Sequence, residues 1–377
     1  MSAPAKPLEV VVNVRHLAGA HTGIEVYMDE LLRALAGTGA VEITALSWAP
    51  LGLGLPGVHE VIPARRPAMR DGSLRATLWK LWFDQWACLR RAPRGRDLLY
   101  HGMDGFLPYA LRKRDRCVAT VHDLGWQAHP ELYNSRLRTM YSALFPWVVR
   151  RADRFIAVSR YTADDLIRRA GVAASRIDVV YHGLDPLYTA AMPAETGTEA
   201  DASPYVLAVG GVSPRKNTRR LIEAFSRWRG RGAHRARFRL LITGISLDRD
   251  FERQGALPEG VTLLGYVDKA ELPRLYAGAA AFLYPGIYEG FGLPIIEAMA
   301  CGTPVVTSST GAAPEIAGGA ARLVDPFDVA SIEAELEAAT QPEEAERLRA
   351  LGQERARAFR WEGAAQGTIE AYRRALA

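Results

Sequence analysis

Short apolar runs and helical patterns alternate along the chain. Runs of strand length occur at residues 8–14, 98–102, 117–121, 205–209 and 279–284. They are apolar almost throughout, which is typical of parallel strands buried on both faces. Helical periodicity follows several of them, for example over residues 25–35. The alternation predicts an α/β fold built on parallel sheets.

The hydrophobic pattern divides the chain into two parts. Periodicity is lost from residue 184 to about residue 203, where prolines and a glycine stand among alanines and acidic residues. We therefore predict a first domain over residues 1–185, a linker over 186–203 and a second domain over 204–360, followed by a helix over 361–377. A chain of 377 residues is long enough for such a two-domain enzyme.

Three of the predicted strands lead into a glycine-containing turn and then a helix. The turns contain Gly23, Gly211 and Gly292, and the third runs through Phe291, Gly292 and Leu293 to a proline typical of a first helical turn. N–H groups at a helix start lack a helical partner, and the helix dipole adds positive potential. Phosphate is the natural ligand of such turns at the carboxyl edge of a parallel sheet.

Charged residues of both signs accompany these turns. Arg215 and Lys216 stand at the tip of the second turn, where a planar fork and a point charge suit a diphosphate. Glu289 precedes the third helix and Glu297 lies inside it, a little over two helical turns away. Ionised carboxylates only accept hydrogen bonds, so both can bind sugar hydroxyls if the loop folds back.

His122 directly follows the apolar run 117–121 and precedes an aspartate. A histidine at the end of a parallel strand is exposed at the ligand edge, so we expect a binding role for His122. A histidine whose hydrogen bonds are satisfied within the core is the alternative.

Composition narrows the partners only slightly. The formal net charge of +5 and the pI near 9.1 favour anionic partners, but nucleic acid, nucleotide sugars and membrane surfaces all qualify. The three cysteines share no metal-ligand spacing, and no run is long enough to span a bilayer. No signal peptide precedes the first strand, so we expect a cytoplasmic protein.

The segment 65–96 mixes aromatic and basic residues. Trp79, Trp82, Phe83 and Trp86 fall on one helical face with arginines and a lysine around them, which predicts an amphipathic helix. The aromatic face can contact an anionic membrane or a lipid-linked acceptor, or it can pack into the core of the first domain. The pattern leaves both open.

The stretch from Glu289 to Val306 contains Glu-x7-Glu within Glu-Gly-Phe-Gly-Leu-Pro-Ile-Ile-Glu-Ala-Met-Ala-Cys-Gly-Thr-Pro-Val-Val. It resembles the signature of glycosyltransferase family 4, retaining sugar-nucleotide enzymes of GT-B architecture. The resemblance implies two Rossmann-like domains that face each other across a deep cleft, with a C-terminal helix that crosses back to the first domain. It also implies a donor held mainly by the second domain and an acceptor by the first.

Three further stretches resemble motifs of the same family. Thr22-Gly23-Ile24-x-x-Tyr27 is similar to the N-terminal loop near the donor phosphates, and His122-Asp123 to the histidine-aspartate motif. The block from Gly210 to Asn217 resembles the diphosphate loop, with Lys216 at the family lysine. The block departs from the common form because Gly211 stands where the family has arginine, and Arg215 is the candidate replacement.

The resemblance also implies roles for single residues. Glu297 would bind the ribose, and Glu289 the hydroxyls of the donor sugar. His122 would position that sugar, and Tyr266 and Val267 would border the nucleobase. Lys216 and its neighbours would neutralise the departing diphosphate, so no metal ion and no cofactor are expected.

We therefore expect a retaining hexosyltransferase of cell-surface polysaccharide assembly, such as lipopolysaccharide synthesis, acting on a glycan or a lipid-linked glycan. GDP-mannose is the first expectation for the donor, with a related deoxysugar or a UDP-hexose as alternatives. A nucleotide-sugar epimerase or hydrolase of the same fold is the second hypothesis. A dinucleotide-dependent oxidoreductase is disfavoured because no Gly-x-Gly-x-x-Gly follows the first strand. No nucleic-acid partner is expected, and peripheral attachment to the inner membrane face is compatible with the basic segment.

Overall fold

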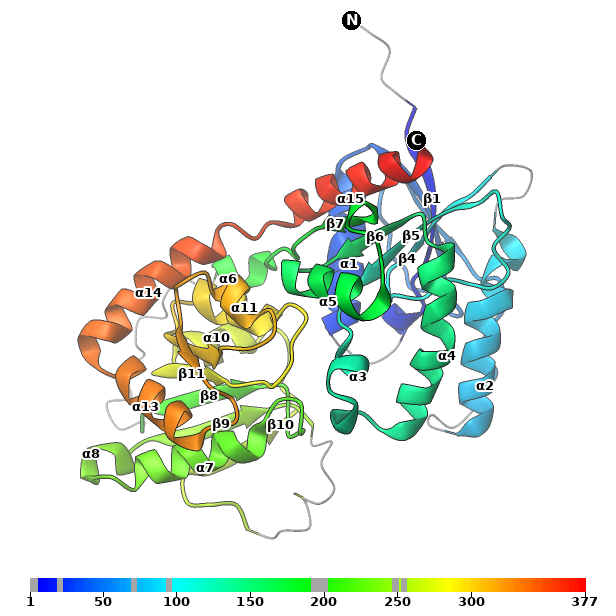
Figure 1. Cartoon of the computed structure of the whole chain (residues 1–377). Helices are drawn as coiled ribbons and strands as arrows, with labels where there is room; N and C mark the ends of the chain where they lie inside the picture. The colour runs from blue at the N-terminus through cyan, green and yellow to red at the C-terminus, as the bar shows by residue number, and fades with distance from the viewer. Residues whose placement is uncertain are drawn as a thin grey trace, which may run out of the picture. The chain divides into compact units, whose positions relative to one another are not determined.

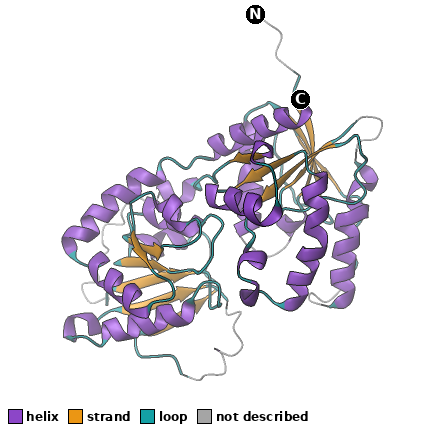
Figure 2. Ribbon diagram, in the orientation of Figure 1, coloured by secondary structure: helices purple, strands orange, loops and turns teal. Residues whose placement is uncertain are grey.

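The computed structural model describes residues 6–18, 23–68, 73–92, 97–190, 203–245, 251 and 256–377. They form two compact units, the first made of Met1–Gly183 with Trp361–Ala377 and the second of Leu184–Arg360. Each unit contains one parallel sheet, with helices beside it (Figure 1, Figure 2).

Unit 1 is built on a seven-stranded sheet in the order β3-β2-β1-β4-β5-β6-β7. Its strands are β1 (Leu8–Asn13), β2 (Val41–Leu46), β3 (Val58–Val61), β4 (Leu99–Gly102), β5 (Arg116–Val121), β6 (Arg154–Ala157) and β7 (Ile177–Val179). All neighbouring strands pair in parallel. The order reverses between β1 and β4, which is the point where open α/β sheets bind ligands.

The helices of unit 1 pack on both faces of this sheet. They are η1 (Arg15–Ala18), α1 (Gly23–Gly37), α2 (Leu74–Trp82), the π-helical turn η2 (Phe83–Ala87), η3 (Cys88–Arg91), α3 (Gly125–Ala128), η4 (Pro130–Leu132), α4 (Ser135–Arg151), α5 (Arg160–Ala170), η5 (Ala174–Arg176) and α15 (Trp361–Leu376). On one face, α1 and α15 pack together over Val10 and Val12, with Tyr372 fully buried between them and the sheet. On the other, Phe83 and Phe145 pack over Val11.

Unit 2 repeats the arrangement with six parallel strands in the order β10-β9-β8-β11-β12-β13. Its strands are β8 (Tyr205–Val209), β9 (Arg239–Thr243), β10 (Val261–Gly265), β11 (Ala281–Tyr284), β12 (Val305–Ser308) and β13 (Arg322–Val324). Its helices are α6 (Pro186–Ala190), α7 (Thr218–Arg229), α8 (Ala233–Ala236), α10 (Leu272–Ala277), α11 (Leu293–Ala300), α12 (Ala313–Ala317), α13 (Val329–Ala339) and α14 (Pro342–Ala356). The strand order reverses between β8 and β11. The predicted pair of Rossmann-like parallel sheets is thus confirmed.

Two local expectations differ from the structure. Helix α6 begins at Pro186, where the sequence predicted a linker, because the Asp185 carboxylate accepts the N–H of Leu187 and Tyr188 is buried beside Tyr276. The structure also assigns this helix to unit 2, whose first residue is Leu184.

The amphipathic helix predicted within 65–96 is shorter and irregular. Helix α2 passes into the π turn η2, which shifts the helical register. Trp79 and Phe83 stack on each other in the core, whereas Trp82 and Trp86 are 38% and 52% exposed. The aromatic set is therefore divided between the core and the surface, and Trp79 belongs to the core. Arg70, Arg94 and Arg96 lie outside the described residues.

Candidate active site

The loops that follow β8 and β11 in unit 2 bring three predicted residues together. Glu289 lies between two cations, with Oε2 2.9 Å from Nη1 of Arg215 and Oε1 2.9 Å from Nζ of Lys216. Burial acts to raise the pKa of Glu289, but the charges of Arg215 and Lys216 outweigh it and lower that pKa. Glu289 is therefore an ionised carboxylate at the point where the strand order reverses.

Tyr284, the last residue of β11, is a partner of Lys216 that the sequence analysis missed. The Lys216 ammonium donates a hydrogen bond to the Tyr284 hydroxyl and lies 4.5 Å from the centre of its ring. Burial lowers the pKa of Lys216, against the opposing effect of Glu289. The lysine is thus held from two sides, by the end of a strand and by the loop after it. Tyr284 could have been found in the sequence from its position at the carboxyl end of a buried strand.

Gly211 explains why the loop departs from the family pattern. Its φ is +72°, and a Cβ atom at this position would lie 2.0 Å from the carbonyl oxygen of Ile245. An arginine at position 211 cannot be accommodated by this backbone. Arg215 donates to Glu289 from four positions further along the chain, so a guanidinium is present at the site without a side chain at 211.

Asn217 connects the turn that carries Arg215 and Lys216, called here the cationic turn, to two other loops. Its φ is 58°, and it is the only non-glycine residue with a positive φ among the described residues. The side chain is buried, and Nδ2 donates to the carbonyl oxygens of Pro285 at 3.1 Å and Pro326 at 2.5 Å. The carbonyl of Arg215 also accepts the N–H of Ile287 at 2.9 Å. These bonds fix the Arg215–Lys216 turn against the loop that carries Glu289.

Helix α11 supplies the predicted amide donors. Gly292 caps it with a φ of +100°, and the helix begins at Leu293. The first-turn N–H groups of a helix have no partner within it. The ring of Phe291 is buried edge-on against Phe359, at 5.8 Å between centroids, so Phe291 supports the loop through packing.

Glu297, on α11, sits among tyrosines. The hydroxyl of Tyr276 donates to its Oε2 at 3.0 Å. Burial raises the pKa of Glu297 to about 7, so the carboxyl is partly protonated near neutral pH. The charges of both glutamates act to raise the pKa of Lys216, against the larger opposite effect of burial.

Tyr266 and Val267 follow β10 at the edge of the unit 2 sheet. Tyr266 is 66% exposed, and Val267 is half-buried. Their surfaces are accessible to a planar ligand, but within the described part of the chain no hydrogen bond or ion pair joins them to Glu289 or Lys216.

His122 follows β5 in unit 1, as predicted. Its Nε2 donates to the carbonyl oxygen of Met103 at 2.8 Å, and Tyr27 stacks edge-on against it at 4.7 Å. Burial lowers the pKa of His122, so the ring is neutral and Nδ1 carries a lone pair. His182 lies 5.7 Å from it and was missed, although it follows β7 as His122 follows β5.

Gly23 begins α1, and the open space around it gives no steric reason for a glycine. Thr22, from the same predicted loop, lies outside the described residues.

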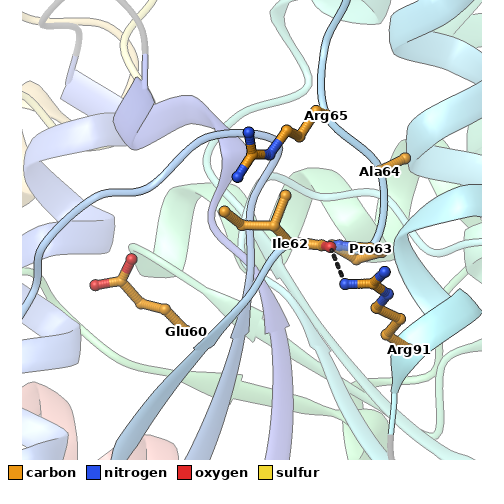
Figure 3. Close-up of a pocket in the computed structure, with 6 residues that line it drawn as sticks. All are labelled: Glu60, Ile62, Pro63, Ala64, Arg65 and Arg91. Atoms are coloured by element: carbon orange, nitrogen blue, oxygen red, sulfur yellow. Dashed lines mark hydrogen bonds between the residues drawn. The ribbon is translucent and has the colours of Figure 1, made fainter.

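A cavity of about 460 Å³ in unit 1 contains none of the predicted site residues (Figure 3). Its walls include Glu60, Arg65 and Arg91. The Glu60 carboxylate accepts the N–H groups of Leu51 and Leu53, and Arg91 donates to the carbonyl of Ile62. The Glu60 carboxylate and the Arg91 guanidinium are therefore both hydrogen-bonded to nearby backbone groups.

Comparison with known proteins identifies the family. Residues 21–187 match the family model "Glycosyltransferase Family 4", and residues 203–341 match "Glycosyl transferases group 1". The chain is 34% identical over 290 residues to O-antigen chain mannosyltransferase B of Escherichia coli, covering 74% of each protein. The chain belongs to glycosyltransferase family 4.

A second relative agrees with this membership, and a solved structure shares the fold. O-antigen chain mannosyltransferase RfbU of Salmonella typhimurium is 27% identical over 85% of this chain and 87% of that protein. Sucrose-phosphate synthase from Thermosynechococcus elongatus has the same fold, with a TM-score of 0.72 and 22% identity over 97% of this chain and 98% of that one. The predicted GT-B architecture and glycosyltransferase class are confirmed, and these transferases give the epimerase or hydrolase hypothesis no support. No helix within the described ranges is both long and apolar enough to cross a membrane.

Proposed function

We propose that this glycosyltransferase moves mannose from GDP-mannose to a glycan or lipid-linked glycan acceptor of cell-surface polysaccharide assembly. Two of its similar relatives are named as O-antigen mannosyltransferases, which supports the sugar and the type of acceptor. The arrangement of Arg215, Lys216 and Glu289 at the strand-order reversal of unit 2 carries the proposal, because it offers charge and acceptors together.

In the proposed reaction, Arg215 and Lys216 bind the diphosphate and neutralise the charge that grows as its bond to the sugar breaks. The free amides of Gly292 and Leu293 add donors and the positive end of a helix dipole. Two cationic side chains at the leaving group support a reaction that needs neither a metal ion nor a cofactor.

The two glutamates bind different rings of the donor. An ionised carboxylate has about four lone-pair positions, so Glu289 can accept sugar hydroxyls while it pairs with both cations. Glu297 accepts from the ribose diol when it is ionised. In unit 1, the neutral His122 accepts a hydroxyl of the transferred sugar at Nδ1. The acceptor attacks the face from which the diphosphate departs, and the anomeric configuration is retained.

The proposed function is tested with purified protein, radiolabelled GDP-mannose or UDP-glucose, and octyl glycosides as acceptors. We expect mannosyl transfer from GDP-mannose, an α-linked product by NMR and unchanged activity in EDTA. Transfer only from UDP-glucose would refute the donor, and a β-linked product would refute retention. Loss of activity in EDTA with recovery in Mn²⁺ would refute the metal-independent reaction. Isomerisation of the donor without an acceptor would restore the epimerase hypothesis.

We also propose that unit 1 attaches to an anionic membrane surface through α2 and η2, on the cytoplasmic face. Leu78, Trp82 and Trp86 expose more than a third of their surface, and the guanidinium of Arg90 lies 5.9 Å from the ring of Trp82. Exposed tryptophans with cations beside them suit the interface of an anionic bilayer.

A further inference from the structure

A second group of charged residues lies at the strand-order reversal of unit 1, after β1 and β4. Arg15 pairs with Asp84, and its Nη2 is 3.8 Å from Oδ2 of Asp104. Nε2 of His16 is 3.2 Å from the same Oδ2. The position in the sheet matches that of Arg215, Lys216 and Glu289 in unit 2, where strand order also reverses.

Three of these side chains are largely buried. Arg15, Asp84 and Asp104 are 12%, 16% and 13% exposed. One guanidinium thus faces two carboxylates, and burial raises the pKa of Asp84 despite its pairing with Arg15. Removing charges from water is unfavourable by several kcal/mol per ion unless each is well paired. Such a group is a weak source of stability, so a role in binding is the better explanation for its position.

The π turn η2 brings Asp84 to this group. Residues 83–87 form the turn, and the Asp84 carboxylate accepts hydrogen bonds from Asn13 and Arg15. π turns inside helices are uncommon and occur often at functional sites.

His16 is the most exposed of these four residues, with 27% of its side chain accessible to solvent. Its Nε2 is engaged by Asp104, and no described residue hydrogen-bonds its Nδ1. A carboxylate at Nε2 favours the tautomer with the proton there, which leaves a lone pair on Nδ1.

The two histidines of unit 1 are anchored by consecutive residues of one loop. Met103 holds His122 through its carbonyl, and Asp104 holds His16 through its carboxylate. Each ring is tied through Nε2 and has Nδ1 for a ligand, and hydroxyl groups are the donors that fit such a pair.

We propose that His16 binds a hydroxyl of the acceptor sugar through Nδ1, with Asp104 as the positioning residue that fixes its tautomer. The inference rests on the proposed function, since it needs a sugar acceptor. This contact with the acceptor is separate from Arg215, Lys216 and Glu289, the charged residues of the candidate site in unit 2.

The test compares His16→Gln with wild type, using GDP-mannose and either octyl α-mannoside or octyl N-acetylglucosaminide. Glutamine keeps a donor for Asp104 but has no acceptor at the Nδ1 position. We expect the KM for the octyl glycoside to rise about tenfold, as for one lost hydrogen bond. The KM for GDP-mannose and its slow hydrolysis without acceptor should stay within about twofold. His16→Asn, which keeps a polar atom near the Nδ1 position, should restore part of the acceptor affinity.

His59→Gln is the matched control, because Nε2 of His59 is 3.1 Å from Glu42 at a site whose side chain is 70% exposed. It should leave both KM values unchanged. An unchanged acceptor KM in His16→Gln, or an equal rise in donor KM and loss of hydrolysis, would overturn the inference while leaving the proposed function standing. Absence of both transfer and hydrolysis in wild type would overturn the proposed function and the inference with it.

Discussion

Substitution of Asn217 tests how the turn that carries Arg215 and Lys216 is held. Its side chain is 3% exposed and donates to two carbonyl oxygens, on the loops after β11 and β13. Its backbone is in the left-handed region, with a φ of 58°. Asn217→Ala removes both donors and keeps the backbone strain. Asn217→Gly removes the same donors but relieves the strain.

The free energies of unfolding of the two variants should therefore differ by the strain that glycine relieves. Leaving two buried acceptors unpaired lowers the free energy of unfolding by roughly 2–4 kcal/mol in total. A left-handed backbone is less favourable for alanine than for glycine by about 1–2 kcal/mol. We expect a loss of roughly 2–4 kcal/mol for Asn217→Ala, and about 1–2 kcal/mol less for Asn217→Gly. Both should weaken GDP binding, because Arg215 and Lys216 lose their support.

Urea unfolding gives the stabilities, and hydrogen–deuterium exchange assigns the loss to unit 2. Titration calorimetry with GDP gives the affinities. Asn134→Ala is the control, since Asn134 caps α4 in unit 1 by accepting the N–H of Leu137 at 2.8 Å. It should cost about 1 kcal/mol and leave GDP affinity unchanged. Equal stability of the alanine and glycine variants would refute the strain argument. Wild-type GDP affinity in both would refute the role of Asn217 in positioning the turn.

Three further predictions concern the proposed donor site and the exposed aromatic residues. Lys216→Ala should lower kcat at least about 100-fold, because the negative charge that develops on the diphosphate in the transition state loses the cation that stabilises it. The melting temperature should change little. Near-normal turnover would place the leaving-group site elsewhere. GDP affinity should rise from pH 6 to 8 as Glu297, with its pKa raised to about 7, ionises, and Glu297→Gln should flatten this profile in calorimetry. The free energy of unfolding depends on pH with the opposite sign. From about pH 4.5 to about pH 7 the Glu297 carboxyl keeps its proton in the folded state but loses it in the unfolded chain, so its stabilising contribution falls as the pH rises through the folded pKa. Replacing Trp82 and Trp86 with serine should weaken co-sedimentation with anionic vesicles but not with neutral ones, and equal sedimentation of variant and wild type would remove the membrane proposal.

The sequence predicted well that the loops carrying Glu289 and Lys216 come together, because this convergence depends on local rules. Glu289 and Lys216 each follow a buried strand and a glycine turn, and parallel strands deliver their carboxyl ends to one edge. Their partners could not be read in the same way. Tyr284 meets Lys216 through pairing of β8 with β11, whose residues are far apart in the sequence.

The segment around α2 was predicted less well for a different physical reason. A regular helix would keep Trp79, Trp82, Phe83 and Trp86 on one face. The π turn adds a residue to the repeat, so the stripe rotates, Phe83 enters the core and Trp86 faces solvent. The turn's contacts include the pairing of Asp84 with Arg15, which no local pattern reveals.

Helix α15 determines the order in which the two units can finish folding during translation. Its Tyr372 hydroxyl is 2.8 Å from Nδ1 of His101, and Arg374 pairs with Asp178, so the helix completes the interior of unit 1. The ribosome must therefore release residues 361–376 before the part of the protein made first can finish folding, whereas unit 2 emerges as one uninterrupted stretch. A stop codon that removes residues 361–376 would consequently damage the unit that was synthesised first.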